Sequence, residues 1–457
     1  MVARASIASG PLMMKAALTF AVGSMGTGLF ATVPGILLLY YMTQTLALPI
    51  ALASLVVLVP KLAVVAIDPL IGLWSDRTRT RWGRRRPFLL VGAIFNAAAF
   101  IALFSVPSLG HHGLTALLLG ALYFLMSSAY SLFAVPYIAM PSELTSDRAE
   151  QSKLIGFRMV FVFVGVLGGA SFAPALVDLF GGDAQAYRLM ALILATISAA
   201  SMLCTAIFAP QSSVPHASSA KELPRTTQLV AITKTPAFSV GVLAYVIAMI
   251  GAATASAAAP YYVTMVLGQP ESVIGLLFLT QVGISLCALL PWSWLLPRLG
   301  AGKALGFACL CTGLASILFA MLNAESGTIA FVAFAALNGI GAGGVQVSAF
   351  ALLAQITGQL NLKFDARLEG AIAGLWSAAE KLALAVGPAI CGLALAHGNY
   401  LSGMPPHAQP SSALSATVLA MSVLPATLLI LGGVIAFAGL NFWRDASAER
   451  NYASSLS

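Results

Sequence analysis

Residues 68–87 read DPLIGLWSDRTRTRWGRRRP and join two very different kinds of sequence. The stretch begins with Asp68 inside a long apolar run, and it ends with six arginines at positions 77, 79, 81, 84, 85 and 86. A carboxylate that must be buried in lipid is costly, so it marks a candidate functional site. A cluster of arginines between two apolar runs is typical of a cytoplasmic loop. The stretch therefore predicts a polytopic membrane protein.

The composition of the whole chain supports the same class. Of 457 residues, 59% are hydrophobic and only 8% are charged, whereas a soluble domain has about 25% charged residues. At roughly 20 apolar residues per crossing, this length suits an all-α protein of about twelve transmembrane helices. The predicted spans are 13–42, 48–75, 86–107, 113–141, 153–180, 186–209, 236–266, 272–296, 302–323, 327–357, 368–397 and 412–442.

The distribution of basic residues predicts how the spans are oriented. With both termini in the cytoplasm, the inner loops and tails carry 19 of the 23 Lys and Arg residues, and the outer loops carry only Arg188. Such an asymmetry is the usual signature of an inner-membrane protein with an even number of spans. It also accounts for the net charge of +8 without nucleic acid as a partner.

The longest polar stretch divides six spans from six, which predicts two bundles joined by a linker, with a ligand bound between them. An offset of 223 residues superposes the starts of the two halves and also carries Arg158 onto Lys381. The predicted parts are an N-terminal six-helix bundle (1–210), a cytoplasmic linker (211–235), a C-terminal six-helix bundle (236–442) and a cytoplasmic tail (443–457).

Charged residues within the spans are the first candidates for the site. Asp68 lies eight residues before Asp76, which is about 12 Å of helix and places it near the middle of the membrane. Lys381 lies fourteen residues, or about 21 Å, beyond Arg367. A buried ammonium needs a partner, and Asp68 is the best in the sequence. The pair is either a coupling site or a permanent structural ion pair. Arg158 is a substrate-binding candidate, although its side chain can also extend to the inner interface.

Uncharged polar and aromatic side chains in the spans join these candidates. Aromatic rings with hydroxyl groups are good platforms for sugars, although Tyr and Trp also mark membrane interfaces. Ser377 lies one turn before Lys381 on the same helix face. The substrate-binding candidates of this kind are Tyr137, Tyr261, Tyr262, Gln346 and Trp376.

Three motifs resemble a known transporter family. The stretch from Asp68 to Phe88, VPYIAMPSELTSDRAEQSKLIGFR at 135–158 and RLEGAIAGLWSAAEKLALAVGPAICG at 367–392 are similar to the glycoside–pentoside–hexuronide:cation symporter branch of the major facilitator superfamily. That branch includes melibiose permease, and the sucrose transporters are relatives. The resemblance implies a major facilitator fold, with Asp68 and Ser377 in the cation site, Lys381 near both sugar and cation, and Arg158 at the sugar.

The chain departs from the family pattern at four positions. The second carboxylate of the second span falls at Val64, the carboxylate of the fourth span at Ala134, its neighbouring indole at Ile138, and the sugar-binding aspartate of the first span at Gly28. A sodium site needs several hard oxygen ligands, so the coupling ion expected here is a proton, with sodium the less favoured ion. Protonation of Asp68 would release Lys381 for the substrate.

The leading hypothesis is therefore a monomeric secondary transporter that imports or exports a sugar or glycoside with protons, by alternating access. The alternative is transport of an anionic solute, such as a hexuronide, an organic acid or a lysophospholipid, with sodium as a possible coupling ion. No nucleophile–base pair, metal spacing or phosphate loop is present, so we expect no enzyme activity and no cofactor. The residues expected at the cytoplasmic gate are Asp76, Arg77, Arg84, Arg85, Arg86, Glu143 and Glu369.

Overall fold

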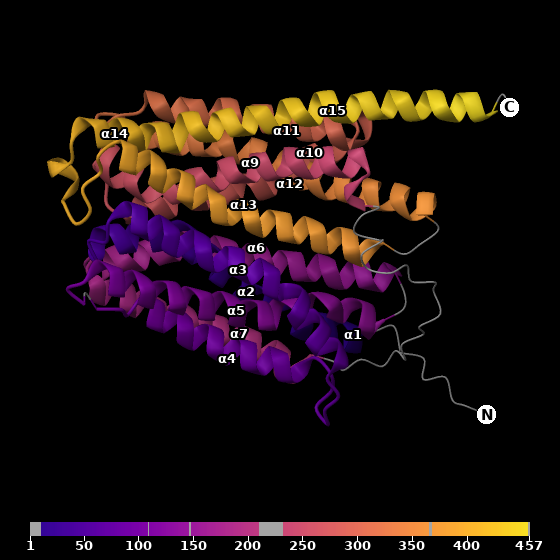
Figure 1. The fold of residues 1–457 in the computed structure, drawn as a ribbon, viewed down its shortest axis with the longest axis horizontal. Coiled ribbons are helices and arrows are strands. Elements are labelled where there is room, and N and C mark those ends of the chain that lie inside the picture. Colours follow the sequence, from indigo (N-terminus) through magenta and orange to yellow (C-terminus); the bar gives the residue numbers. More distant parts are fainter. Residues whose placement is uncertain (1–10, 108, 146–147, 210–231, 365–367, 456–457) are drawn as a thin grey trace. The chain divides into compact units, whose positions relative to one another are not determined.

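The computed structural model describes residues 11–107, 109–145, 148–209, 232–364 and 368–455 (Figure 1). Within these ranges every regular element is a helix. Twelve helical segments in the described part are long and apolar enough to cross a membrane. Their bounds follow the predicted spans closely, from Met14–Leu38 for the first to Ser411–Gly439 for the last. The prediction of a twelve-span, all-α membrane protein is confirmed.

The chain forms two compact units. The first contains residues 1–34 and 59–217, and the second contains residues 35–58 and 218–457. The predicted linker, 211–235, lies largely outside the described residues. The assignment of Gly35–Leu58 to the second unit was not expected from the sequence, because these residues belong to the first two spans.

Close approaches between helix backbones hold the first unit together. Helix α2 packs on α6 and α7, and α4 packs on α5 and α7. A methyl group at Gly28 or Gly165 would overlap a backbone carbonyl oxygen, that of Val162 or Met25 respectively. Small residues at such positions let helices approach closely in lipid, where van der Waals contact drives association. The helices of this unit are α1 (Pro11–Ala21), α2 (Gly23–Val33), most of α3 (Ile50–Arg77), α4 (Arg86–Leu103), α5 (His112–Leu144), α6 (Arg148–Leu179) and α7 (Ala184–Phe208).

The second unit is built around α9, which packs on α13 and α15, while α12 packs on α10 and α11. Short π-helices interrupt the ends of three spans. The elements are η1 (Pro34–Leu38), η2 (Tyr41–Thr45), α9 (Pro236–Tyr261), η3 (Tyr262–Val266), α10 (Ser272–Leu299), α11 (Ala301–Leu318), η4 (Phe319–Met321), α12 (Thr328–Phe364), α13 (Glu369–His397), η5 (Pro406–Ala408), α14 (Ser411–Val418), η6 (Leu419–Val423) and α15 (Leu424–Ser455). The helical backbone of α15 therefore continues well into the predicted tail, 443–457.

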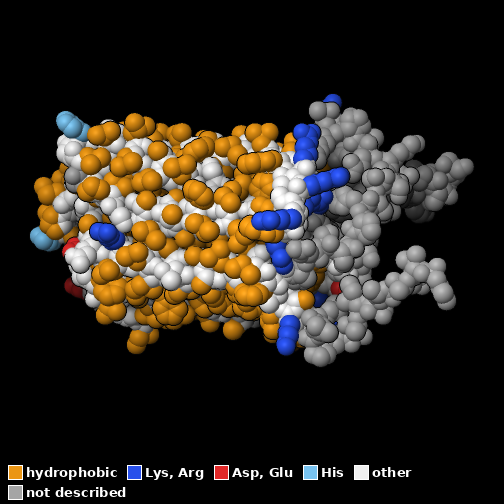
Figure 2. Space-filling model, turned by 90° about the horizontal axis from the view of Figure 1, so that it is seen from below, with side chains coloured by type: hydrophobic (Ala, Val, Ile, Leu, Met, Phe, Trp, Pro, Cys, Tyr) orange, Lys and Arg blue, Asp and Glu red, His pale blue; other side chains and the backbone are white. Residues whose placement is uncertain are grey.

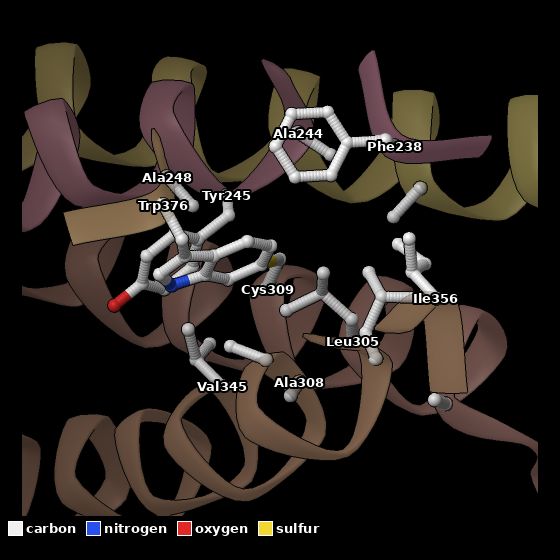
Figure 3. Close-up of a cluster of buried hydrophobic side chains, with 14 of the residues drawn as sticks. Phe238, Ala244, Tyr245, Ala248, Leu305, Ala308, Cys309, Val345, Ile356 and Trp376 are labelled. Atoms are coloured by element: carbon white, nitrogen blue, oxygen red, sulfur yellow. The ribbon is translucent and has the colours of Figure 1, made fainter. Parts of the chain in front are cut away.

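A hydrophobic cluster fills the interior of the second unit. Figure 3 shows the indole of Trp376 face to face with the ring of Tyr245, with Leu305, Cys309 and Val345 nearby. The centroids of the two rings are 4.7 Å apart, and the angle between the ring planes is 21°. Stacked rings of this kind add about 1 kcal/mol beyond the area they bury. The cluster fixes α13 against α9, and thereby the register of Lys381 in α13.

The outer surface matches a lipid solvent. Large apolar side chains such as Phe95, Leu117 and Ile329 are exposed, a pattern that water would penalise and a bilayer accepts. Figure 2 shows hydrophobic side chains over the middle of one face, with most of the Lys and Arg side chains of that face at one end. The chain is a multi-pass membrane protein.

Candidate functional site

Asp68 lies half-buried in α3 and is followed directly by Pro69. Proline has no backbone N–H, so the carbonyl of Val65, four residues earlier, loses its partner within the helix. The sequence therefore places a carboxylate and an incompletely bonded carbonyl oxygen within one turn of each other. Both are groups that a cation or a proton carrier prefers.

Arg158 and Tyr137, two predicted substrate-binding residues, meet in the first unit. The guanidinium of Arg158 in α6 lies 5.4 Å from the centre of the Tyr137 ring in α5. The Tyr137 hydroxyl donates to the Phe20 carbonyl at 2.6 Å, so the Ser24 hydroxyl, 2.7 Å away, donates to Tyr137. Tyr137 is completely buried. The tyrosine is thus fixed by two hydrogen bonds and holds the guanidinium over its ring by a cation–π contact.

One donor of Arg158 is left over by this arrangement. Its Nε is buried and has no hydrogen-bond partner among the described residues. A buried donor without an acceptor costs about 1–3 kcal/mol, more where the group is charged. A ligand that brought an acceptor oxygen to Nε would remove this cost, so the geometry suits such a ligand.

The four family departures have clear structural settings. At Gly28 the backbone of α6 comes so close that no side chain fits. Val64 and Ala134 are buried, and Ile138 is 54% exposed. None of the four positions supplies an oxygen from its side chain, so in the described part of the first unit the acidic candidate within the spans is Asp68.

In the second unit, α13 places its polar residues differently. The Tyr245 hydroxyl donates to the Glu380 carboxylate at 3.0 Å, so Glu380 faces the neighbouring helix α9. Trp376 is only 3% exposed and belongs to the hydrophobic cluster of Figure 3, where it stacks on Tyr245. Ser377 and Lys381 are half-buried on the same helix. The structure therefore places Trp376 in the core of the unit, and its role as a sugar platform stays a prediction.

The adjacent tyrosines of α9 and η3 are fully buried. The Tyr261 hydroxyl lies 2.6 Å from Oγ1 of Thr43, and Tyr262 donates to the Phe319 carbonyl at 2.6 Å. Gln346 is half-buried in α12. In this conformation both tyrosine hydroxyls are used by the protein itself, and their predicted contact with a substrate remains untested.

A small cavity with a mainly apolar lining lies inside the second unit. It has a volume of about 60 Å³ and is lined by residues of α9, α10, α11, η4, α12, η6 and α15. At its wall, Gln281 donates to Asn338 at 2.6 Å and Asn338 donates to Ser316 at 2.9 Å. A cavity of this size has room for water at these polar groups, and none of the predicted substrate-binding residues lines it. Sequence reasoning missed Asn338, because one amide in an apolar span carries no local signal of its partner.

The arginine-rich loop makes contacts within its own unit. Arg85 is buried and donates to Ser75 at 2.5 Å, and Arg86 donates to the Ala209 carbonyl at the end of α7 at 2.8 Å. Arg77 is exposed and Arg84 half-buried. The side chains of the expected acidic gate residues, Asp76, Glu143 and Glu369, lie outside the described part of the structure. The gate therefore remains a prediction.

Twelve apolar spans in two compact units, with charged side chains held inside the spans, define a secondary transporter of the major facilitator type. Sequence comparison supports this class. The chain matches the family described as MFS/sugar transport protein over residues 19–438 and belongs to that family.

Two relatives are similar over most of their length. YagG of Escherichia coli (strain K12), whose name assigns it provisionally as a glycoside/cation symporter, is 26% identical over 450 residues, covering 96% of this chain and 94% of YagG. The isoprimeverose transporter of Lactiplantibacillus pentosus is 25% identical over 391 residues, covering 83% of this chain and 78% of its own length.

Solved structures agree on the fold. A bacterial homologue of the human lysosomal transporter Spinster, in an inward-facing and unoccupied conformation, superposes with a TM-score of 0.73 at 14% identity, covering 95% of this chain and 98% of the other. The nucleoside transporter NupG gives a TM-score of 0.62 at 14% identity, covering 95% and 99%. The prediction of a major facilitator fold from the glycoside–cation symporter branch is confirmed.

Proposed function

We propose that this protein is a symporter of a sugar or glycoside, driven by protons and working by alternating access. The relatives named as glycoside/cation symporter and isoprimeverose transporter support the substrate class. The family supports transport between two bundles that rock around a central site.

The observation that carries the proposal is the buried Nε of Arg158. A sugar hydroxyl or ring oxygen supplies the missing acceptor, while the neighbouring Tyr137 ring offers an apolar face to the sugar ring. Tyr137 is held by Ser24 and Phe20, so both groups are in position before the substrate arrives. Preorganisation of this kind lowers the entropic cost of binding.

The small number of carboxylates at the family's site positions favours a proton as the coupling ion. Sodium binds through several oxygen ligands, yet Val64, Ala134 and Gly28 replace the family's further carboxylates. A single carboxylate, Asp68, is enough to carry a proton. In the proposed cycle a protonated Asp68 no longer attracts Lys381, and the freed ammonium turns to the substrate.

The setting proposed for this cycle is a bacterial inner membrane, with both termini in the cytoplasm and the transporter acting as a monomer. The support is the bias of 19 to one in Lys and Arg between the predicted inner and outer loops, because such a bias sets orientation during insertion.

Uptake into proteoliposomes tests the proposal. The vesicles are given either a pH gradient or a sodium gradient, and a panel of labelled solutes that includes isoprimeverose, other disaccharides and a hexuronide. We expect accumulation of a neutral sugar under the pH gradient, abolished in Asp68→Asn. Arg158→Lys keeps the charge but removes Nε, and we expect it to weaken uptake about tenfold or more, since one hydrogen bond to a charged donor is worth about 1.5–3 kcal/mol.

The same assay tests an anionic substrate, which the unused guanidinium donor also suits, because a carboxylate is the strongest acceptor for arginine. Uptake of the hexuronide alone would overturn the neutral-sugar assignment. Uptake driven by sodium alone would overturn the proton assignment and direct attention to the carbonyl of Val65 as an extra ligand near Asp68.

A further inference from the structure

The first and seventh spans end in the same short motif. Residues 40–49 read YYMTQTLALP, and residues 261–270 read YYVTMVLGQP. Two tyrosines, a threonine, a leucine and a proline recur at the same spacing, 221 residues apart. A general apolar composition does not explain a shared order of polar and apolar residues.

The backbone conformation of the two segments is also the same. Both segments leave the α-helix as a π-helix, Tyr41–Thr45 and Tyr262–Val266. The N–H of Leu46 bonds the Tyr41 carbonyl at 3.2 Å, and the N–H of Leu267 bonds the Tyr262 carbonyl at 3.1 Å. Each turn then passes through a left-handed residue, Ala47 (φ 51°) and Gly268 (φ 61°). An isolated π-turn is rare and is frequently found at functional sites.

The two copies bind each other reciprocally within the second unit. The Tyr40 hydroxyl donates to Oγ1 of Thr264 at 3.3 Å, and the Tyr261 hydroxyl pairs with Oγ1 of Thr43 at 2.6 Å. The rings of Tyr40 and Tyr261 meet edge to face with centroids 5.0 Å apart. Each tyrosine therefore reaches the threonine of the opposite copy, as a two-fold relation between the copies requires.

The loop between α13 and α14 packs against both copies of the motif. The ring of Tyr400 meets that of Tyr261 edge to face at 5.4 Å. Gly403 donates its N–H to the Thr43 carbonyl at 2.9 Å, and a methyl group at Gly403 would lie 2.7 Å from Cβ of Ala47. Burial raises the pKa of the Tyr400 hydroxyl.

We infer that Tyr40, Thr43, Tyr261 and Thr264 form a reciprocal lock. It closes the end of the transporter that carries the α13–α14 loop, and it must separate once in each transport cycle. The chain of Gly35–Leu58 runs on into the first unit at both of its ends, so opening between the halves at this end pulls the first copy away from the second. Both hydrogen bonds and the ring contact then break together.

A native thiol reports the opening. Cys391 in α13 is fully buried, and it lies near Tyr261 and Tyr400. When the lock separates, this thiol becomes accessible to a small polar reagent. The other cysteines, Cys204, Cys287, Cys309 and Cys311, are distinguished from it by peptide mass spectrometry.

The experiment measures the rate at which a methanethiosulfonate reagent modifies Cys391 in the purified full-length protein. Tyr40→Phe and Thr43→Val each remove one bond of the lock, and each is expected to raise the rate about fivefold, from the net worth of one hydrogen bond. The two together are expected to raise it about 25-fold, because opening breaks both bonds at once. Tyr262→Phe is the matched control, since it removes the neighbouring hydroxyl that bonds Phe319.

The inference is overturned if the reagent modifies Cys391 no faster in Tyr40→Phe and Thr43→Val than it does in Tyr262→Phe. It is equally overturned if all three variants accelerate modification of Cys309, another buried cysteine, by the same factor, because that result means general loosening. The assay contains neither sugar nor ion gradient. Its failure is therefore distinct from failure of the proposed sugar and proton assignments.

Discussion

Replacement of Gly28 by alanine tests the packing that shapes the first unit. The added methyl group would overlap the Val162 carbonyl oxygen and lie 2.9 Å from the Val166 nitrogen. Ordinary contacts between such atoms are about 3.5–4.0 Å. Both obstacles are backbone atoms of α6, which cannot turn away as a side chain can, so α2 and α6 have to separate.

The expected effect has two opposing parts. Overpacking a well-packed interior costs about 1–3 kcal/mol, and contact with backbone on two sides favours the upper end. Alanine in place of glycine favours a helix by about 1 kcal/mol. We expect a net loss of about 2 kcal/mol for Gly28→Ala. The matched control is Gly168→Ala in α6, whose methyl group would meet only Cδ2 of Phe172 at 3.9 Å, and which keeps the helix gain.

Thermal unfolding of the detergent-solubilised protein, followed at one scan rate for both variants, provides the measurement. Gly28→Ala should unfold well below the parent chain, and Gly168→Ala at or above it, a difference of about 3 kcal/mol. Equal unfolding temperatures for the two variants would refute the close approach of α2 and α6. They would also reopen Gly28 as a place where a carboxylate could fit.

Two further predictions concern buried hydrogen bonds. Thr205 accepts from the Gly23 N–H and donates to the Thr19 carbonyl, both at 2.7 Å; Thr205→Val should cost about 2–3 kcal/mol of unfolding free energy, whereas Thr196→Val, at an exposed position, should cost almost none. Tyr245→Phe removes the donor to Glu380 and should lower the free energy of unfolding, measured with denaturant, by about 1.5–3 kcal/mol. Combining it with Glu380→Gln should recover part of that loss. Strictly additive effects in the double variant would contradict the pairing.

The spans and the fold class were predictable because their causes are local. Runs of apolar residues set the length of each helix, and the arginines of 77–86 mark the end of α3 and the start of α4; residues that act in this way lie next to one another in the sequence. The pairing of Arg158 with Tyr137 was only partly predictable, since both were selected as polar groups in spans but their contact joins α5 to α6. Helix periodicity alone does not say which faces meet.

The partners of aromatic residues were not predictable from local pattern. Trp376 has the composition of a sugar platform, yet its indole is stacked on Tyr245, 131 residues away. Tyr261 finds Thr43 at a separation of 218 residues. The repeat YYxTxxLxxP was visible in the sequence, but the reciprocal bonds between its copies depend on how two distant helix ends are brought together. Long-range pairing of this kind is a property of the packed structure.

The helix α3 gives the transporter a mechanical element of its own. It runs unbroken from Ile50 to Arg77, yet residues 35–58 and 59–217 belong to different compact units. Pro60, next to this boundary, and Pro69, beside Asp68, each remove one backbone hydrogen bond, so the helix bends more easily at these two positions. A single α-helix therefore joins the two units, with a proline next to the point where one unit ends and the other begins. Asp68 lies two turns beyond Pro60 on this helix, so a bend at Pro60 shifts the carboxylate relative to residues 50–59.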